Sequence, residues 1–220
     1  MRTNKLMAFV LTFVMALSAS TMCLAAMQGD VDQAVAILQR FQEIPEKSIP
    51  PAVLKQAKGL AILTVTKAGF IVSGRGGTGV VVSRLAKGWS GPSAIGTGGA
   101  GFGLQIGAQV SEFVIILNTP EAVKAFSRGG NISLGADLSV TAGPVGRDVS
   151  ADVLPTAAVY SYSRSQGLFA GVSLEGTVIA ARDDANAQYY GRKVTPAQIL
   201  SGQVKPPKGA AGLVKALSRY

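Results

Sequence analysis

The sequence predicts an α+β domain: a strongly curved antiparallel β-sheet, sandwich-like or barrel-like, that short helices cover. Three observations indicate this class. From Leu60 onward apolar residues recur at every second position, which is the period of a β-strand. Segments before Leu60, and two further along the chain, have the length and capping residues of short helices. One predicted strand has glycine along a face, and glycine is costly there unless the sheet bends or another backbone approaches closely.

The first predicted helix spans residues 30–41, DVDQAVAILQRF. Its apolar stripe consists of Val31, Ala34, Val35, Leu38 and Phe41. This stripe either packs on the domain or lies on a membrane. We expect packing, because Ala34 and Ala36 make the stripe thin and the carboxylates of Asp30 and Asp32 would face an anionic surface. A second short helix, PAVLKQAK, is expected to begin at Pro51 and to end with Gly59 as its C-cap.

The stretch IVSGRGGTGVVVSR places Gly74, Gly76 and Gly79 in the G-x-G-x-x-G spacing of a dinucleotide-binding loop. Such a loop requires a helix after the third glycine and an acidic residue about 20 positions further on. Here three valines follow, which favour a strand, and the next carboxylate is that of Glu112. We therefore predict a hairpin, with strands at residues 69–73 and 80–84 joined by a glycine-rich turn.

The next segments alternate strongly. In GAGFGLQIGAQV one face is apolar and the other is mostly glycine; the apolar face comprises Ala100, Phe102, Leu104, Ile106, Ala108 and Val110. FVIILN is apolar throughout, which predicts a strand at residues 113–117 buried on both sides. NISLGADLSV and LFAGVSLEGTVIA repeat the alternation. TPEAVKAFSRGG and TPAQILSG predict helices with Thr119 and Thr195 as N-caps.

Residues 1–25 are a predicted signal peptide. Arg2 and Lys5 precede an apolar run at residues 6–17, which is shorter than the ~20 residues of a membrane span. Cys23-Leu24-Ala25 offers a cleavage site with small residues at its first and third positions; lipid attachment to Cys23 is the alternative, although Met22 is bulkier than lipoprotein processing normally accepts. We therefore expect an exported protein, periplasmic or secreted, with a single domain over residues 27–220.

The chain is basic, with 21 Lys and Arg against 12 Asp and Glu and a formal net charge of +9. Removal of Arg2 and Lys5 with the leader leaves 19 of those 21 basic residues and a net charge of +7. Such a charge favours anionic partners. We expect phospholipid headgroups rather than nucleic acid, because the tyrosines that could stack on bases fall in the alternating core pattern: Tyr160, Tyr162, Tyr189 and Tyr190.

The side chains that catalysis needs are scarce. The chain contains no histidine, which excludes Ser-His-Asp and Cys-His nucleophilic systems. Ser90 in GWSGP lies in an expected turn, without the G-x-S-x-G pattern of a nucleophile elbow. Asp183 and Asp184 are the only adjacent carboxylates; a solvated loop explains them, and a weak calcium site is the alternative. We expect no enzyme, no metal and no cofactor.

Several stretches resemble the SYLF domain, a lipid-binding module also described as an actin-binding domain in eukaryotic members. They are AKGLAILTVTKAGFIVSGRGGTGVVVSR, WSGPSAIG, GFGLQIGAQVSEFVIILN, AGPVGR and SRSQGLFAGVSLEG followed by YYG, and together they cover residues 49–191 in the family's order. The resemblance implies binding of phospholipids, phosphoinositides in eukaryotic members, through basic residues and an amphipathic N-terminal helix. It implies no catalytic residue and no cofactor. Lys67 and Arg84 match basic residues of the family, whereas Glu112 stands where an aspartate is expected.

We therefore expect a peripheral module that binds anionic phospholipid membranes. An exported chain does not meet cytosolic actin, so the actin label is not carried over. The candidate lipid-binding residues are Lys55, Lys58, Lys67, Arg75, Arg84 and Lys87. The alternative is a structural or protein-interaction module of the cell envelope, whose partner binds the glycine-striped sheet or the tail VKPPKGAAGLVKALSRY. That tail forms either a detached basic helix or a helix that caps the barrel.

Overall fold

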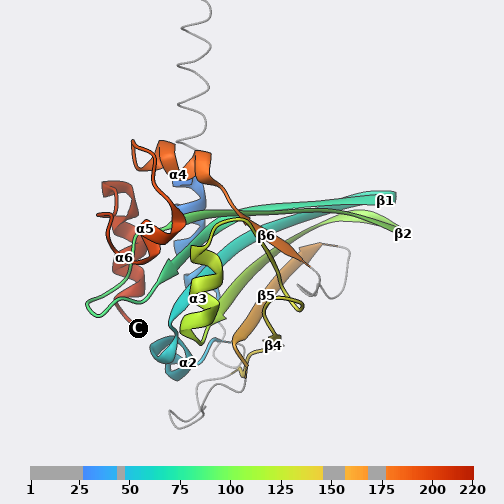
Figure 1. Cartoon of the computed structure of the whole chain (residues 1–220). Coiled ribbons are helices and arrows are strands. Elements are labelled where there is room, and N and C mark those ends of the chain that lie inside the picture. Colours follow the sequence, from blue (N-terminus) through green and yellow to red (C-terminus); the bar gives the residue numbers. More distant parts are fainter. Residues whose placement is uncertain (1–26, 44–47, 146–156, 168–176) are drawn as a thin grey trace, which may run out of the picture.

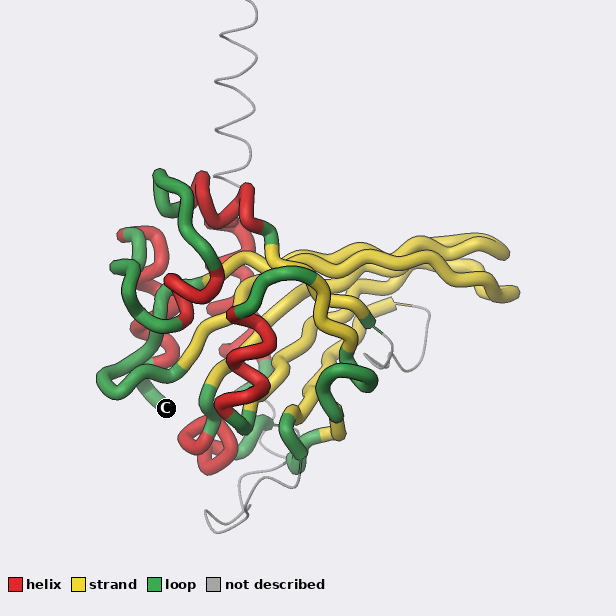
Figure 2. The backbone as a smooth tube through the Cα atoms, viewed as in Figure 1, coloured by secondary structure: helices red, strands yellow, loops and turns green. Residues whose placement is uncertain are grey.

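The computed structural model describes residues 27–43, 48–145, 157–167 and 177–220 of the chain (Figure 1). The predicted signal peptide and most of the predicted strand LFAGVSLEGTVIA lie outside these ranges. Within them the fold is α+β, with a strongly curled sheet and short helices, which confirms the predicted class (Figure 2).

A helix at residues 27–40 precedes the sheet. The remaining elements, in chain order, are α2 (Pro51–Gln56), β1 (Gly59–Ser83), β2 (Ser93–Leu117), α3 (Pro120–Ser127), β3 (Asn131–Ser133), β4 (Val140–Ala142), β5 (Val159–Gly167), β6 (Val178–Ala181), α4 (Asp183–Tyr189), α5 (Pro196–Leu200), the 3₁₀ turn η2 (Lys208–Ala210) and α6 (Ala211–Leu217). The predicted N-caps are confirmed, since the Thr119 and Thr195 hydroxyls accept hydrogen bonds from backbone N–H groups of α3 and α5.

Among the described residues, six strands form one sheet, in the order β3-β6-β2-β5-β4 with β1 on β2. The beginning of β2 pairs with β6, and its end pairs with β5. All pairs are antiparallel except β4 with β5, so the sheet is mixed where the sequence predicted an antiparallel one. β3 and β4 are short because NISLGADLSV is not one strand: Gly135 has a φ of 99° and the chain turns there.

β1 and β2 form a 25-residue ribbon that bends back on itself (Figures 1 and 2). The bend lies near Phe70 and Val72, where the pairing register shifts. Beyond it, the second half of β1 lies against the first: a Cβ on Gly77 would stand 2.5 Å from the Thr64 carbonyl oxygen. The predicted hairpin at residues 69–84 is therefore wrong. Gly77 and Gly79 permit the close approach of one half of the strand to the other. No helix follows Gly79, as the rejection of a nucleotide loop required.

Where the helices cover it, the sheet is buried on both sides. Alternate residues of β1, such as Leu60 and Ala61, enter two different core clusters. The first cluster joins the sheet to the helix at residues 27–40, to α2, α4 and α6; the second joins it to α3 and α5. The strand predicted to be buried on both faces is confirmed, because every side chain from Phe113 to Leu117 has 0% exposure.

The N-terminal helix packs on the domain, as expected. Val31, Leu38 and Phe41 are buried, and so is Ile37, which the predicted stripe omitted. The C-terminal tail also docks rather than detaching: Leu213 and Leu217 are fully buried in the first core cluster. α2, in contrast, ends before Gly59, which belongs to β1 and lies against Val82.

Candidate functional site

The six candidate lipid-binding residues share one continuous segment. Residues 48–111 contain six basic side chains and no carboxylate. This acid-free segment builds α2, β1, the loop to β2 and most of β2. Most of the ribbon that defines the fold thus belongs to a segment that carries cations and no carboxylate of its own.

Three of the six cations lie at one end of the ribbon. Lys55 and Lys58 are exposed, in and just after α2, and Lys87 is exposed in the loop between β1 and β2. The Arg84 N–H donates to the Lys58 carbonyl over 2.8 Å, which joins the two ends of β1. The structure therefore places these three lysines at the same end of the ribbon, free of carboxylate neighbours within the segment.

Arg84 lies at this end too, but its guanidinium makes contacts within the domain that stabilise the fold. It donates to the Leu54 and Ala57 carbonyl oxygens, each over 2.7 Å, at the C-terminal end of α2. It also stacks over the Trp89 ring, with 4.2 Å from Cζ to the ring centroid. Burial lowers the pKa of this guanidinium from its ordinary value. Because those donors are already bound to carbonyls, Arg84 is less available to a ligand than the three lysines.

Lys67 and Arg75 lie on either side of the bend of the ribbon, away from α2, and both are partly buried. Lys67 is opposite Gln109, and Arg75 is opposite Gly99. A Cβ on Gly99 would stand 2.9 Å from Arg75 Nε, so this glycine leaves room for the arginine to lie across β2. The six cations therefore form two groups on one ribbon rather than a single cluster.

At the end of GAGFGLQIGAQV the apolar side of the strand faces outward. Ala108 and Val110 are exposed, Val110 at 43%, whereas Gln109 and Ser111 are buried. Ser111 faces inward because its hydroxyl pairs with that of Ser165 on β5 over 3.0 Å. Among the described residues, neither polar atom of the Gln109 amide has a hydrogen-bond partner. The sequence could not reveal this orientation, since a period-two pattern does not state which face is inside.

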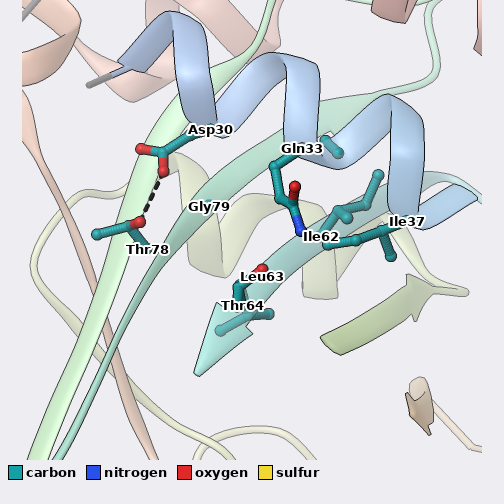
Figure 3. Close-up of a pocket in the computed structure, with 9 residues that line it drawn as sticks. Asp30, Gln33, Ile37, Ile62, Leu63, Thr64, Thr78 and Gly79 are labelled. Carbon is teal, nitrogen blue, oxygen red and sulfur yellow. Dashed lines mark hydrogen bonds between the residues drawn. The ribbon is translucent and has the colours of Figure 1, made fainter. Parts of the chain in front are cut away.

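Ion pairs hold the polar edge of the N-terminal helix. Arg40 contacts the carboxylate of Glu112 through two hydrogen bonds, of 2.6 and 3.0 Å, and Asp30 pairs with Arg182 at 2.8 Å. Asp30 also accepts a hydrogen bond of 2.6 Å from Thr78, as Figure 3 shows. Glu112, the residue that departs from the expected aspartate, is thus a partner of the helix.

A cavity of about 180 Å³ lies between this helix and β1. Figure 3 shows Asp30, Gln33 and Ile37 of the helix facing Ile62, Thr64 and Thr78 of the strand. The Gln33 side chain donates to Glu112 over 3.3 Å, and Asp30 is bound as above, so these two side chains help to dock the helix. Among the described residues, the buried Thr64 hydroxyl in the cavity lining has no hydrogen-bond partner. We assign this cavity to helix packing.

Catalytic groupings are not found in the part of the chain that the structure describes. No three His, Cys, Asp or Glu side chains gather there as a metal site would require. The buried Ser90 hydroxyl accepts from the Ser83 N–H and donates to the Gly91 carbonyl, so it stabilises its turn. Asp183 and Asp184 begin α4, where the sequence predicted a loop. None of the described helices is long and apolar enough to cross a membrane.

The curled sheet presents a basic ribbon, which is the kind of surface through which an interaction module binds a partner. Residues 98–220 match the family model Ysc84, described as "Las17-binding protein actin regulator". The chain belongs to this Ysc84 family, which confirms the resemblance to the SYLF domain.

Three relatives illustrate the similarity. "LAS seventeen-binding protein 3" of Saccharomyces cerevisiae is 52% identical over 177 residues, which are 78% of this chain and 39% of that protein. "Protein YSC84" of the same yeast is 48% identical over 202 residues, 87% and 43% of the two chains. "SH3 domain-containing YSC84-like protein 1" of Homo sapiens is 46% identical over 202 residues, 88% and 59%. The chain thus spans between two fifths and three fifths of these relatives' length.

Proposed function

We propose that the protein is a peripheral module that attaches to anionic phospholipid membranes through the acid-free segment. The observation that supports this most directly is the charge of residues 48–111, with six cations and no carboxylate. A surface of one sign attracts ligands of the other sign and raises their rate of association. Phosphate headgroups at a membrane surface are such a ligand.

The contact would be mainly electrostatic. Each lysine near an anionic membrane contributes about 1 kcal/mol, so the exposed Lys55, Lys58 and Lys87 together give roughly a hundredfold in affinity. Because exposed charges are screened within a Debye length of about 8 Å at physiological ionic strength, the attachment should weaken as salt is added.

Vesicle co-sedimentation tests the proposal. The protein should sediment with vesicles containing phosphatidylserine or phosphoinositide at low salt, less at high salt, and little with neutral phosphatidylcholine vesicles. Changing Lys55, Lys58 and Lys87 to Gln should lower binding to anionic vesicles by roughly a hundredfold. A matched variant with the same loss of charge changes the exposed Lys193, Lys205 and Lys215 to Gln and should bind nearly as the parent does. Equal binding to neutral and anionic vesicles would refute the electrostatic part of the proposal.

We also propose that the protein acts outside the cytoplasm, after export by the signal peptide at residues 1–25. The charged start, the apolar run and the small residues around Ala25 support this. Cell fractionation and mass spectrometry of the purified protein test it. A chain that keeps Met1 and stays in the cytosolic fraction would contradict it.

A protein partner is the second candidate function, because the names of the family model and of the yeast relative describe proteins that bind Las17. For this chain the partner would belong to the envelope. Cross-linking in intact cells, followed by the same comparison of lysine variants, distinguishes the two functions. A cross-linked protein partner that survives the Lys55, Lys58 and Lys87 substitutions, together with no vesicle binding, would favour this alternative.

A further inference from the structure

A groove of about 460 Å³ lies between the N-terminal helix and α6. Its volume falls in the range of about 300–1,000 Å³ that is common for small-molecule sites. Its lining contains no residue of the acid-free segment, so it differs from the surface proposed to attach to membranes. We infer that this groove binds a small amphiphilic anion, that is, a dissolved molecule with a carboxylate or phosphate group on an apolar body. The inference goes beyond the proposed function and does not depend on it.

Part of the groove lining is apolar. Val35 and Leu38 contribute to it from the N-terminal helix, and Ala216 contributes from α6. Val35 and Ala216 are partly exposed, so apolar surface is left uncovered in the groove. Gly212 keeps the groove open on the side of α6, since a Cβ at this position would have no atom within 4 Å. An apolar body that lies against these residues would remove their surface from water, which is favourable.

Both cations of the groove come from the side of α6. Lys215 and Arg219 are four residues apart, a spacing that brings side chains together along one side of a helical turn. Both side chains are exposed, and within the described part of the chain neither forms an ion pair. Two neighbouring cations repel each other, and an anion placed between them is attracted to both. This pair therefore provides a place for the charged group of the ligand.

The opposite side of the groove carries little charge that would repel an anion. Its carboxylate, that of Glu43, contacts Arg164 at 3.4 Å, and Arg164 does not line the groove. The other polar side chains on this side are the neutral amides of Gln39 and Gln42, and that of Gln42 donates to the Ile49 carbonyl oxygen. The groove thus combines an apolar area with cations on one side, which favours an amphiphilic anion over a neutral or cationic molecule.

Calorimetric titration of the purified protein tests the inference. The ligands are decanoate and decyl phosphate, used below the concentrations at which they form micelles. Each should bind with one molecule per chain. Decanol has the same apolar body without the charge and should bind about tenfold more weakly, because two exposed ion pairs are missing. Acetate has the charge without the apolar body and should not bind measurably.

A substitution that fills the groove provides the second measurement. Gly212→Leu should abolish binding of decanoate, because the new side chain occupies the open space beside α6. Its melting temperature should not fall, since the position is exposed and glycine is unfavourable in a helix. Ala211→Leu is the matched control: residue 211 is the exposed neighbour that does not line the groove, and the variant should bind as the parent does.

Charge substitutions test the two cations. Lys215→Gln combined with Arg219→Gln should weaken binding of decanoate about tenfold and leave binding of decanol unchanged. Lys193→Gln combined with Lys205→Gln removes the same charge from exposed positions outside the groove and should have no effect. An equal loss in the two double variants would mean that the net charge of the protein, and not the groove, attracts the anion, and would overturn the inference.

The remaining outcomes keep the inference separate from the proposed function. The Lys55, Lys58 and Lys87 variant should lose vesicle binding and keep its affinity for decanoate. Absence of decanoate and decyl phosphate binding, or equal affinity for decanoate and decanol, would overturn the inference and leave the function standing. Displacement of decanoate by phosphatidylserine vesicles would show that the groove takes part in the membrane contact, and would overturn a dissolved molecule as its occupant.

Discussion

Gly79 shows how one residue permits the fold. Its backbone lies against residues 62 and 63 of the same strand: a Cβ there would overlap the Ile62 carbonyl oxygen and stand 2.6 Å from the Leu63 Cα. Both neighbours are backbone atoms, which cannot move aside as a flexible side chain can. Gly76, three residues earlier in the same strand, has nothing within 4 Å of the corresponding position. The two glycines therefore have different roles, although the sequence motif treats them alike.

Gly79→Ala should destabilise the protein by about 1–3 kcal/mol, because the new methyl group forces the two halves of β1 apart. Gly76→Ala is the control and should change the free energy of unfolding by less than about 0.5 kcal/mol. Chemical denaturation of both variants measures the difference. Equal stabilities would mean that the halves of β1 do not approach as closely as the structure shows.

Arg84 and Lys87 are cations three residues apart with opposite expected roles. Arg84→Gln should lower stability by about 2 kcal/mol, because it removes charged hydrogen bonds to two backbone carbonyls and the contact with Trp89. Lys87→Gln should leave stability unchanged and weaken vesicle binding, because that side chain is exposed. Thermal melts and sedimentation of both variants check this; a stable Arg84→Gln would contradict the role assigned here.

At the scale of elements, two kinds of contact hold the N-terminal helix on the domain: apolar packing and ion pairs. Its apolar side enters the first core cluster, and its polar edge is fixed by Arg40 to Glu112 and by Asp30 to Arg182. Ion pairs at partly exposed positions contribute little by themselves. The buried stripe therefore supplies most of the docking energy, and the ion pairs determine how the helix is placed on the sheet.

Leu38→Glu should lower the free energy of unfolding by about 3–5 kcal/mol, because Leu38 is 3% exposed and the new carboxylate would be buried without a partner. Gln39→Glu adds the same charge one residue later, at an exposed position, and should have little effect. Melting temperatures of the two variants decide the point. A helix that waits undocked for a membrane would make the two variants equally stable.

The elements that the sequence predicted well are those governed by local rules. Thr119 and Thr195 mark helix starts because an N-cap hydroxyl acts within its own turn. The strand at residues 113–117 was recognisable because a continuous apolar run must be buried on both sides.

Other features depend on distant contacts. Whether Gly76 and Gly79 form a turn or a crossing depends on where residues 62–64 lie, and whether Val110 faces inward depends on Ser165 of β5. For the same reason, the sequence was enough to select the six cations as candidates. It could not predict that they form two groups, or that the Arg84 guanidinium binds backbone carbonyls of the domain.

For the whole molecule, three tyrosines join separate parts of the chain. The Tyr162, Tyr189 and Tyr190 hydroxyls donate to the Pro144 carbonyl, the Gln28 side chain and the Pro92 carbonyl, respectively. Burial raises the pKa of all three phenols, that of Tyr189 to about 12. An ionised phenol would lose its donor and carry a charge into the core.

Stability should therefore fall at alkaline pH. The folded-state pKa values lie above the unfolded value of about 10, so the stabilisation is complete below about pH 10 and is lost as pH rises through the folded-state values. Unfolding free energies measured from pH 8 to pH 12 should decline in the upper part of this range. Tyr162→Phe should reduce that decline, because one buried ionisable phenol is removed; an unchanged pH profile in this variant would contradict the assignment.

The bend in the ribbon also restricts how this protein can vary in length. From Phe70 to Val72 β1 advances by two residues, while β2 advances by four, from Ile106 to Phe102. The excess is an even number, so the paired residues of β1 and β2 keep the same face on both sides of the bend. Within β1, Leu60 before the bend and Val80 after it lie an even number of residues apart, and both enter the first core cluster. A one-residue insertion in β1 at the bend would turn Val80 and Val82 toward the opposite layer. We therefore expect natural insertions and deletions in this ribbon to occur in steps of two residues.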